Sequence, residues 1–393
     1  MPRSVAIREP YRLFFPAGLF AGLLGVALWP AWVWGGMALY PGPLHARLMS
    51  MGLLGAFVVG FSATALPRMM GTGPLGGGVV VGLGLLWSGA VGAQIVGVAW
   101  LGDLLFGLTL LLLILSLLAR FIRRLDLPPP AFVLTAFGLV LGLTGAVALA
   151  WAEYPVGTLP SADWIYRWGR VALHEGFLLG VAGGVGAFFF PRLWGGRTRQ
   201  DFPEMKRPDA RWASQGWVAF WAGMGLTAGC GLDAAGFVRA GTLLRLTSFG
   251  FFVISEVAAT LGLRSESTLG GLARIGLFLI PVGLLLEIVV LPGQLTGIRH
   301  LIMIGGFNLI LFAVATRVIF GHAGERDRTT GRMISMRWVG GLLMVAALTR
   351  VSADFLPSVY QSHLGYAAVF WLSAALIWSG LIFQRISRAD PED

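Results

Sequence analysis

The chain has 393 residues, of which 56% are hydrophobic and 12% are charged, and its mean hydropathy is +0.77. This composition excludes an ordinary water-soluble domain and is typical of a polytopic membrane protein whose main partner is the lipid bilayer. The net charge of +10 is a topology signal in such a protein, not an indication of nucleic-acid binding. A single cysteine excludes an internal disulfide and a cysteine-bound iron–sulfur cluster.

Apolar runs of about 20 residues, the length that crosses a bilayer, recur along the whole chain. We place twelve of them, near 13–35, 44–66, 75–94, 97–119, 130–151, 171–191, 213–235, 240–262, 273–292, 299–317, 334–351 and 360–383. The sequence therefore predicts an all-α polytopic membrane protein with about twelve transmembrane helices. We expect these helices to form one transmembrane domain over residues 1–393.

The basic residues indicate the orientation of these helices. With the N-terminus placed inside, most of the 29 Lys and Arg residues fall on the inner side of the membrane. The segments expected on the outer side hold only Arg167, Arg170, Arg239, Arg299 and Arg350. This bias predicts that both termini are cytoplasmic. The first apolar run lacks a small-residue cleavage site, so we interpret it as a helix and not as a signal peptide.

Three segments share one plan, in which a histidine opens an apolar run that closes on an arginine. They start at His45, His174 and His300, and their closing arginines are Arg68, Arg192 and Arg317, at a nearly constant spacing. A fixed long period indicates a chain built from similar blocks. We expect a threefold pseudo-repeat of four helices, over roughly residues 1–125, 126–250 and 251–393.

Four of the five histidines are expected toward the outer ends of even-numbered helices: His45, His174, His300 and His363. An imidazole inside lipid needs a partner, and two histidines from separate helices are an axial ligand set for haem iron. We therefore take His45, His174 and His300 as candidate metal ligands and His363 as a further cofactor-binding candidate. The alternative is that each histidine only hydrogen-bonds a neighbouring helix. The helical rise places His174 and His300 at matching depths, which makes them one candidate pair.

Two arginines, Arg47 and Arg245, lie within expected spans. A buried arginine can hold a haem propionate through a two-pronged hydrogen bond, so both are candidate cofactor-binding residues. The alternatives are an ion pair, such as Arg47 with Glu287, or snorkelling to the interface. Met49 and Met303 follow two of the histidines at helical spacing, which would suit copper or simple packing.

Three stretches of the chain carry a resemblance to a known family. They are Pro10-Tyr11-Arg12-Leu13-Phe14-Phe15, the run from His45-Ala46 to Ala65-Leu66-Pro67, and the run from His300 through Thr316-Arg317-Val318 to Gly321-His322-Ala323-Gly324. In these stretches the sequence resembles the NnrS family, the haem- and copper-containing bacterial membrane proteins linked to nitric-oxide stress. The resemblance implies haem and copper as cofactors, nitric oxide or another small diatomic gas as a partner, and the bacterial inner membrane as the location. The chain departs from the family pattern at Arg47 and Leu48, where a second histidine and a glutamate would stand, and this departure bears on copper.

The layout also resembles subunit I of the haem–copper oxidases, with twelve helices and histidines on the second, sixth and tenth. That resemblance implies a haem between His45 and His300, with His174 available to a second haem or metal. The seventh span lacks a histidine, and the tenth lacks a His-x-His motif. We therefore do not expect an oxygen-reducing binuclear centre.

The expected function is that of an inner-membrane haem protein of NnrS type. It would bind or turn over nitric oxide, as a haem-dependent oxidoreductase, or transfer electrons at haem. A multi-pass transporter that uses intramembrane Arg and carboxylate side chains is the alternative. A scaffold without cofactor is a third hypothesis. No feature of the sequence indicates the electron donor.

Overall fold

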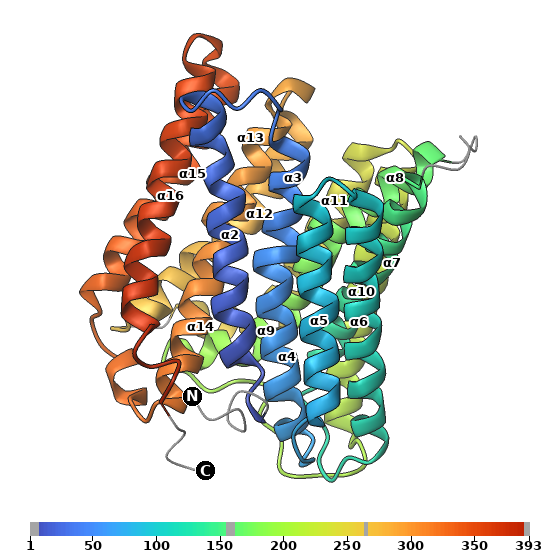
Figure 1. Ribbon diagram of the computed structural model, residues 1–393. Coiled ribbons are helices and arrows are strands. Elements are labelled where there is room, and N and C mark those ends of the chain that lie inside the picture. Colours follow the sequence, from blue (N-terminus) through green and yellow to red (C-terminus); the bar gives the residue numbers. More distant parts are fainter. Residues whose placement is uncertain (1–7, 155–161, 263–265, 389–393) are drawn as a thin grey trace. The chain divides into compact units, whose positions relative to one another are not determined.

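The computed structural model describes residues 8–154, 162–262 and 266–388, and every regular element in these ranges is a helix (Figure 1). All twelve predicted helices are found there. In chain order they are α2 (Tyr11–Val33), α3–η1–α4 (Gly42–Arg47, Leu48–Leu54, Gly55–Met69), α5 (Gly77–Ile95), α6 (Ala99–Ile122), α7 (Phe132–Ala152), α8–η2–α9 (Ala162–Val171, Ala172–Gly176, Phe177–Leu193), α10 (Ala210–Ala234), α11 (Val238–Leu261), α12 (Thr268–Val289), α13–η4–α14 (Leu295–His300, Leu301–Asn308, Leu309–His322), α15 (Ile334–Phe355) and α16 (Tyr360–Ile382). The all-α polytopic fold is thus confirmed.

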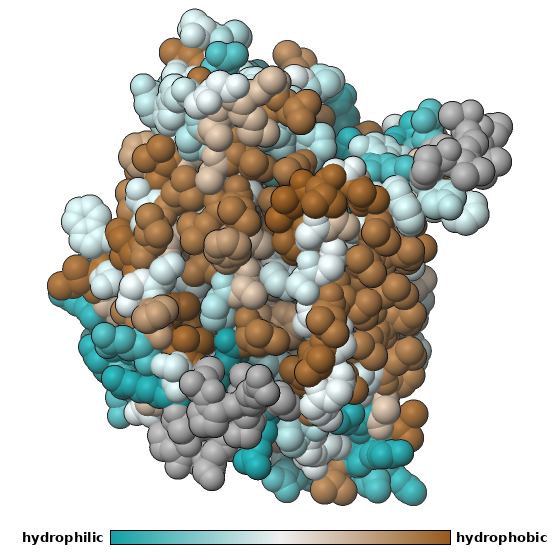
Figure 2. Space-filling view, viewed as in Figure 1, coloured by the Kyte–Doolittle hydropathy of each residue, from teal (hydrophilic) through white to brown (hydrophobic). Residues whose placement is uncertain are grey.

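Eleven helical segments among the described residues are long and apolar enough to cross a membrane. The remaining predicted helix, α10, has 25 residues, but its N-terminal half carries Arg211, Ser214 and Gln215, which lower its hydropathy. Large apolar side chains on α5 and α6 are exposed, among them Val81, Leu85 and Leu115. Figure 2 shows hydrophobic residues covering the surface over these two helices. Such a surface is suited to lipid.

The chain divides into two compact units. The first contains the described residues of Met1–Gly18, Ser50–Phe188 and Thr198–Val257. Its helices pack closely: a Cβ on Gly180 of α9 would lie 2.6 Å from the Cα of Gly138 on α7. This approach explains part of the high glycine content, because small residues let membrane helices pack backbone to backbone.

The N-terminal Pro-Tyr-Arg motif fastens the start of α2 within this first unit. Glu9, which is fully buried, forms ion pairs with Arg12 and, at 3.0 Å, with Arg68 at the end of α4. The backbone N–H of Tyr11 donates to Thr64 Oγ1 at 3.0 Å. The motif therefore has a structural explanation in the pairing of α2 with α4.

The second unit contains the described residues of Leu19–Met49, Phe189–Arg197 and Ala258–Asp393. Here α15 and α16 run side by side (Figure 1). Trp378 of α16 is buried, packs on Phe312 of α14 and donates to Thr316 Oγ1 at 2.8 Å. These contacts fix α14 and α16 together, and α14 is the continuation of the helix that carries His300.

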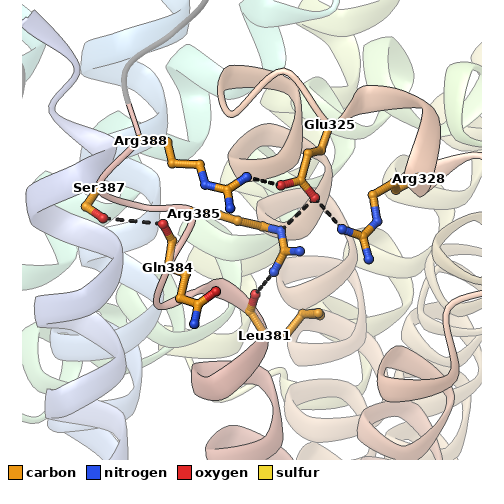
Figure 3. A network of polar contacts seen from close by, with 7 residues as sticks. All are labelled: Glu325, Arg328, Leu381, Gln384, Arg385, Ser387 and Arg388. Atoms are coloured by element: carbon orange, nitrogen blue, oxygen red, sulfur yellow. Dashed lines mark hydrogen bonds and ion pairs between the residues drawn. The ribbon is translucent and has the colours of Figure 1, made fainter.

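A polar network closes one end of the second unit (Figure 3). Glu325, in the connection between α14 and α15, forms ion pairs with Arg328 at 2.7 Å, with Arg385 at 3.0 Å and with Arg388. Burial raises the pKa of the Glu325 carboxyl, but its hydrogen bonds and ion pairs with Arg385 and Arg328 outweigh burial and hold that pKa below its usual value. The network therefore joins the segment after α16 to the α14–α15 connection.

Candidate cofactor site

The rings of His45 and His300 face each other in the second unit. Their centroids lie 6.1 Å apart and their planes differ by only 14°. His45 is in α3 and His300 is the last residue of α13, so the second and tenth predicted helices meet here. Trp29 of α2 packs edge-on against the His45 ring, with centroids 5.5 Å apart, and limits its rotation.

One nitrogen of each ring is committed to a backbone carbonyl. His45 Nδ1 lies 2.9 Å from the Gly25 carbonyl, and His300 Nδ1 lies 2.7 Å from the Thr296 carbonyl. A carbonyl oxygen only accepts, so Nδ1 is the donor in both rings and Nε2 keeps its lone pair. This is the hydrogen-bonding state of metal-ligating histidines, in which Nδ1–H fixes the ring and Nε2 is the ligand.

The spacing of the two rings fits an axial pair on one iron. Two imidazoles bound through nitrogen at about 2.0–2.1 Å each, with about 1 Å from each nitrogen to its ring centre, have centroids about 6 Å apart. The observed centroid distance of 6.1 Å equals this spacing. The residues present therefore fit a haem with two histidine ligands.

The three histidines that open the predicted repeats each stand at a π-helical segment. Segment η1 begins at Leu48, just after His45; η2 contains His174; and η4 begins at Leu301, directly after His300. Longer π-helical segments are rare and occur frequently at functional sites. This common local structure supports the predicted threefold repeat, which itself stays a prediction. The hydrophobic periodicity of the sequence gave no sign of the π-helical segments.

An ion pair that sequence analysis missed lies beside the two rings. Arg350, which was expected on the outer side of the membrane, is a buried residue of α15 and pairs with Asp354 at 2.8 Å. It lies within electrostatic range of both His45 and His300. Its buried Nε has no hydrogen-bond partner. In the sequence, the i, i+4 spacing of Arg350 and Asp354 could have indicated this ion pair.

A second buried carboxylate belongs to the same unit. Glu287 of α12 is buried and lies 3.7 Å from Nε of Arg299, the neighbour of His300. Arg299, which like Arg350 was expected on the outer side, belongs to α13. Arg47 is buried at the end of α3. The pairing of Arg47 with Glu287, and its role toward a propionate, stay predictions.

His363 is placed separately from the His45–His300 ring contact. It lies in α16, where Nδ1 is 2.9 Å from the Ser352 hydroxyl of α15. This contact corresponds to the alternative in which a histidine hydrogen-bonds a neighbouring helix. A cofactor role for His363 stays a prediction.

His174 and Arg245 belong to the first unit. His174 Nδ1 lies 2.8 Å from the Ser50 hydroxyl. Arg245 is fully buried and pairs with Glu175 and Asp233 at 3.0 Å each. Its guanidinium is thus already held by two carboxylates, as in the ion-pair alternative, and a propionate would have to displace one of them. Cofactor roles for both residues stay predictions.

No cluster of three or more His, Cys, Asp or Glu side chains suited to a metal ion occurs among the described residues. A copper site of that kind is therefore not seen in this part of the chain. A haem iron held by two histidines needs no such cluster, because the porphyrin supplies its other ligands.

Comparisons with known proteins show the fold and the family of this chain. The chain is similar in fold to a chain from a cryo-EM structure of a heme-copper terminal oxidase dimer, with a TM-score of 0.63 and 11% sequence identity over 98% of this chain and 83% of that chain. At this identity the likeness shows the fold alone, and it confirms the predicted oxidase-like layout. No curated protein matches the chain. The model of the NnrS family, described as NnrS protein, matches residues 5–389. Because that match covers nearly the whole chain, the protein belongs to the NnrS family.

Proposed function

We propose that this protein is an inner-membrane haem protein that acts in the bacterial response to nitric-oxide stress, with His45 and His300 as the axial ligands of the haem. The observation that carries the proposal is the near-parallel pair of imidazoles, whose Nδ1 atoms both donate to carbonyls. Membership of the NnrS family and the oxidase-like fold support it.

Bound haem supplies one-electron redox chemistry. If both histidines bind the iron, the arrangement would leave no coordination position open for a gas. The geometry therefore favours electron transfer at haem over direct binding of nitric oxide. Arg350 adds a positive charge near both ligands, which favours the reduced iron.

The proposal also includes the cytoplasmic orientation of the termini, the threefold helical repeat and copper as a second cofactor. Cytoplasmic termini follow from the basic residues, and three π-helical segments at equivalent histidines support the threefold repeat. Copper follows from the family resemblance alone.

An absorption spectrum of the detergent-solubilised protein tests the proposal. We expect a Soret band and sharp reduced α and β bands that nitric oxide does not shift at early times. His45→Ala and His300→Ala should each abolish this bis-histidine spectrum. His322→Ala, a histidine at the end of α14, is the matched control and should keep it.

Two other results would lead to different conclusions. A Soret band that shifts promptly with nitric oxide would indicate an open iron site and gas chemistry. A colourless protein from cells well supplied with haem would overturn the proposal. The transporter would then be the preferred hypothesis. The buried cluster of Arg245, Glu175 and Asp233 favours that function.

A further inference from the structure

The two histidines of the candidate site differ in the surroundings of the peptide groups that accept their Nδ1 hydrogen bonds. His300 Nδ1 donates to the carbonyl of Thr296, and the N–H of the same peptide group, that of Gly297, donates to Asp354 Oδ2 at 2.5 Å. The other oxygen of Asp354 accepts from Arg350 Nη1 at 2.8 Å. A single peptide group thus connects the imidazole of His300 to a carboxylate.

This chain of hydrogen bonds corresponds to a carboxylate–histidine–metal arrangement with a peptide group inserted. In the direct arrangement, the carboxylate accepts from Nδ1–H and raises the basicity of the ligand nitrogen. Here the Asp354 carboxylate polarises the Thr296–Gly297 peptide. Its carbonyl then becomes a stronger acceptor for His300, because hydrogen bonds in a chain strengthen one another.

His45 has a simpler environment. Its Nδ1 donates to the carbonyl of Gly25, in the middle of α2. That peptide group belongs to an ordinary helical hydrogen-bond ladder. The two ligands are therefore unequal, and His300 is the one connected to a buried charge.

The position of Asp354 is well defined. The Asp354 side chain is 3% exposed and that of Arg350 is 6% exposed, so neither charge is screened by water. Gly297 has little room beside the carboxylate, because a Cβ built there would lie 3.0 Å from Asp354 Oδ2. The absence of a side chain at residue 297 lets the carboxylate reach the backbone N–H.

We propose that Asp354 is a positioning residue that tunes the His45–His300 site through the Thr296–Gly297 peptide group, and that Arg350 sets how much of the Asp354 charge reaches His300. This inference rests on the proposed haem function. A more basic His300 stabilises ferric iron and lowers the midpoint potential. The Arg350 charge acts in the opposite direction, both directly and by compensating Asp354.

Spectroelectrochemical titration of the haem in single variants provides the first test. Asp354→Asn keeps the side-chain shape but removes the negative charge, so we expect the midpoint potential to rise. Arg350→Gln removes the positive charge and leaves Asp354 uncompensated, so we expect the potential to fall. Shifts of the same sign, or unchanged potentials in both variants, would overturn the proposal.

A double variant separates the peptide path from simple charge. Asp354→Asn/Arg350→Gln removes both charges, so independent through-space effects predict a shift equal to the sum of the two single-variant shifts. If the peptide path operates, Arg350 acts partly by compensating Asp354, so the potential of the double variant lies above that sum. A shift equal to the sum would overturn the peptide path. If the Arg350→Gln protein does not fold, a comparison of Asp354→Asn with Asp354→Glu serves as the test. Asp354→Glu keeps the negative charge but moves it away from the Gly297 N–H, so the midpoint potential of this variant should also rise.

Glu325→Gln is the matched control, since it removes a carboxylate of the same unit that lies beyond the far end of α14. Its potential should equal that of the wild type. The two hypotheses fail in different ways: a colourless wild-type protein overturns the haem function, whereas a coloured protein with unmoved potentials overturns only the role of Asp354.

Discussion

The hydroxyl of Ser50 lies 2.8 Å from Nδ1 of His174, and this contact joins two π-helical segments, η1 and η2, within the first unit. His174 is thus held by a side chain, whereas His45 and His300 are held by backbone carbonyls. The three histidines of the predicted repeats are therefore not equivalent in their hydrogen bonding.

His174→Ala should keep the bis-histidine spectrum of the His45–His300 haem. The expected cost is about 1 kcal/mol of stability for the lost hydrogen bond. Spectra and haem-to-protein ratios of wild type, His174→Ala and Ser50→Ala provide the measurement. Loss of all haem from His174→Ala would contradict the assignment of His45 and His300, and a halved ratio would identify His174 as the ligand of a second haem.

Gly25→Ala should disturb the His45 ring. A Cβ at this buried residue would lie 2.9 Å from Leu48 Cβ, and the Gly25 carbonyl is the acceptor for His45 Nδ1. We expect a loss of stability of about 1–3 kcal/mol from overpacking, together with weaker haem retention. Haem transfer to an apoprotein acceptor measures that retention. Gly92→Ala, where nothing lies within 4 Å of the new Cβ, should behave as the wild type.

Arg245→Leu should be strongly destabilising. It leaves Glu175 and Asp233 buried without the guanidinium that now lies 3.0 Å from each. Breaking a buried ion pair by removing one partner costs about 3–5 kcal/mol. Thermal unfolding in detergent measures the effect, and Arg239→Ala on the exposed start of the same helix should change stability by less than about 0.5 kcal/mol. Equal melting temperatures for both variants would show that the cluster contributes nothing.

Acid should weaken the Glu325 network. The folded-state pKa of this carboxyl is lowered, so its ion pairs stabilise the protein above the unfolded-state pKa, and this contribution is lost as the pH falls through the folded-state pKa. We expect Glu325→Gln to lose about 1 kcal/mol near neutral pH and to show a flatter dependence of melting temperature on pH below about 4.5. Parallel pH profiles for the variant and the wild type would contradict this account.

The helices could be predicted because membrane spans follow from local composition. Runs of apolar residues of sufficient length identified all twelve, and the four histidines on even-numbered helices were noticed because an imidazole stands out in such a run. The spacing of residues along a helix also gave approximate depths.

The contacts around the histidines could not be predicted in the same way. Depth arithmetic assumed ideal α-helices and matched His174 with His300 in height, but the ring next to His300 is that of His45. The interrupting π-helical segments change rise and rotation locally, and composition does not encode them. The Arg350–Asp354 ion pair was missed because Arg350 was read only as a topology signal near the end of a span, whereas Asp354, one turn later, pairs with it within α15.

The π-helical segments have a mechanical consequence. In the three helices that carry His45, His174 and His300, the wide turn replaces the regular i→i−4 ladder next to the histidine or around it, so the backbone there lacks the α-helical hydrogen bonds of the rest of the helix. Each of these helices therefore changes its local geometry at a candidate site residue. A deformation of that single turn would move the imidazole, while the long apolar remainder of the helix keeps its packing.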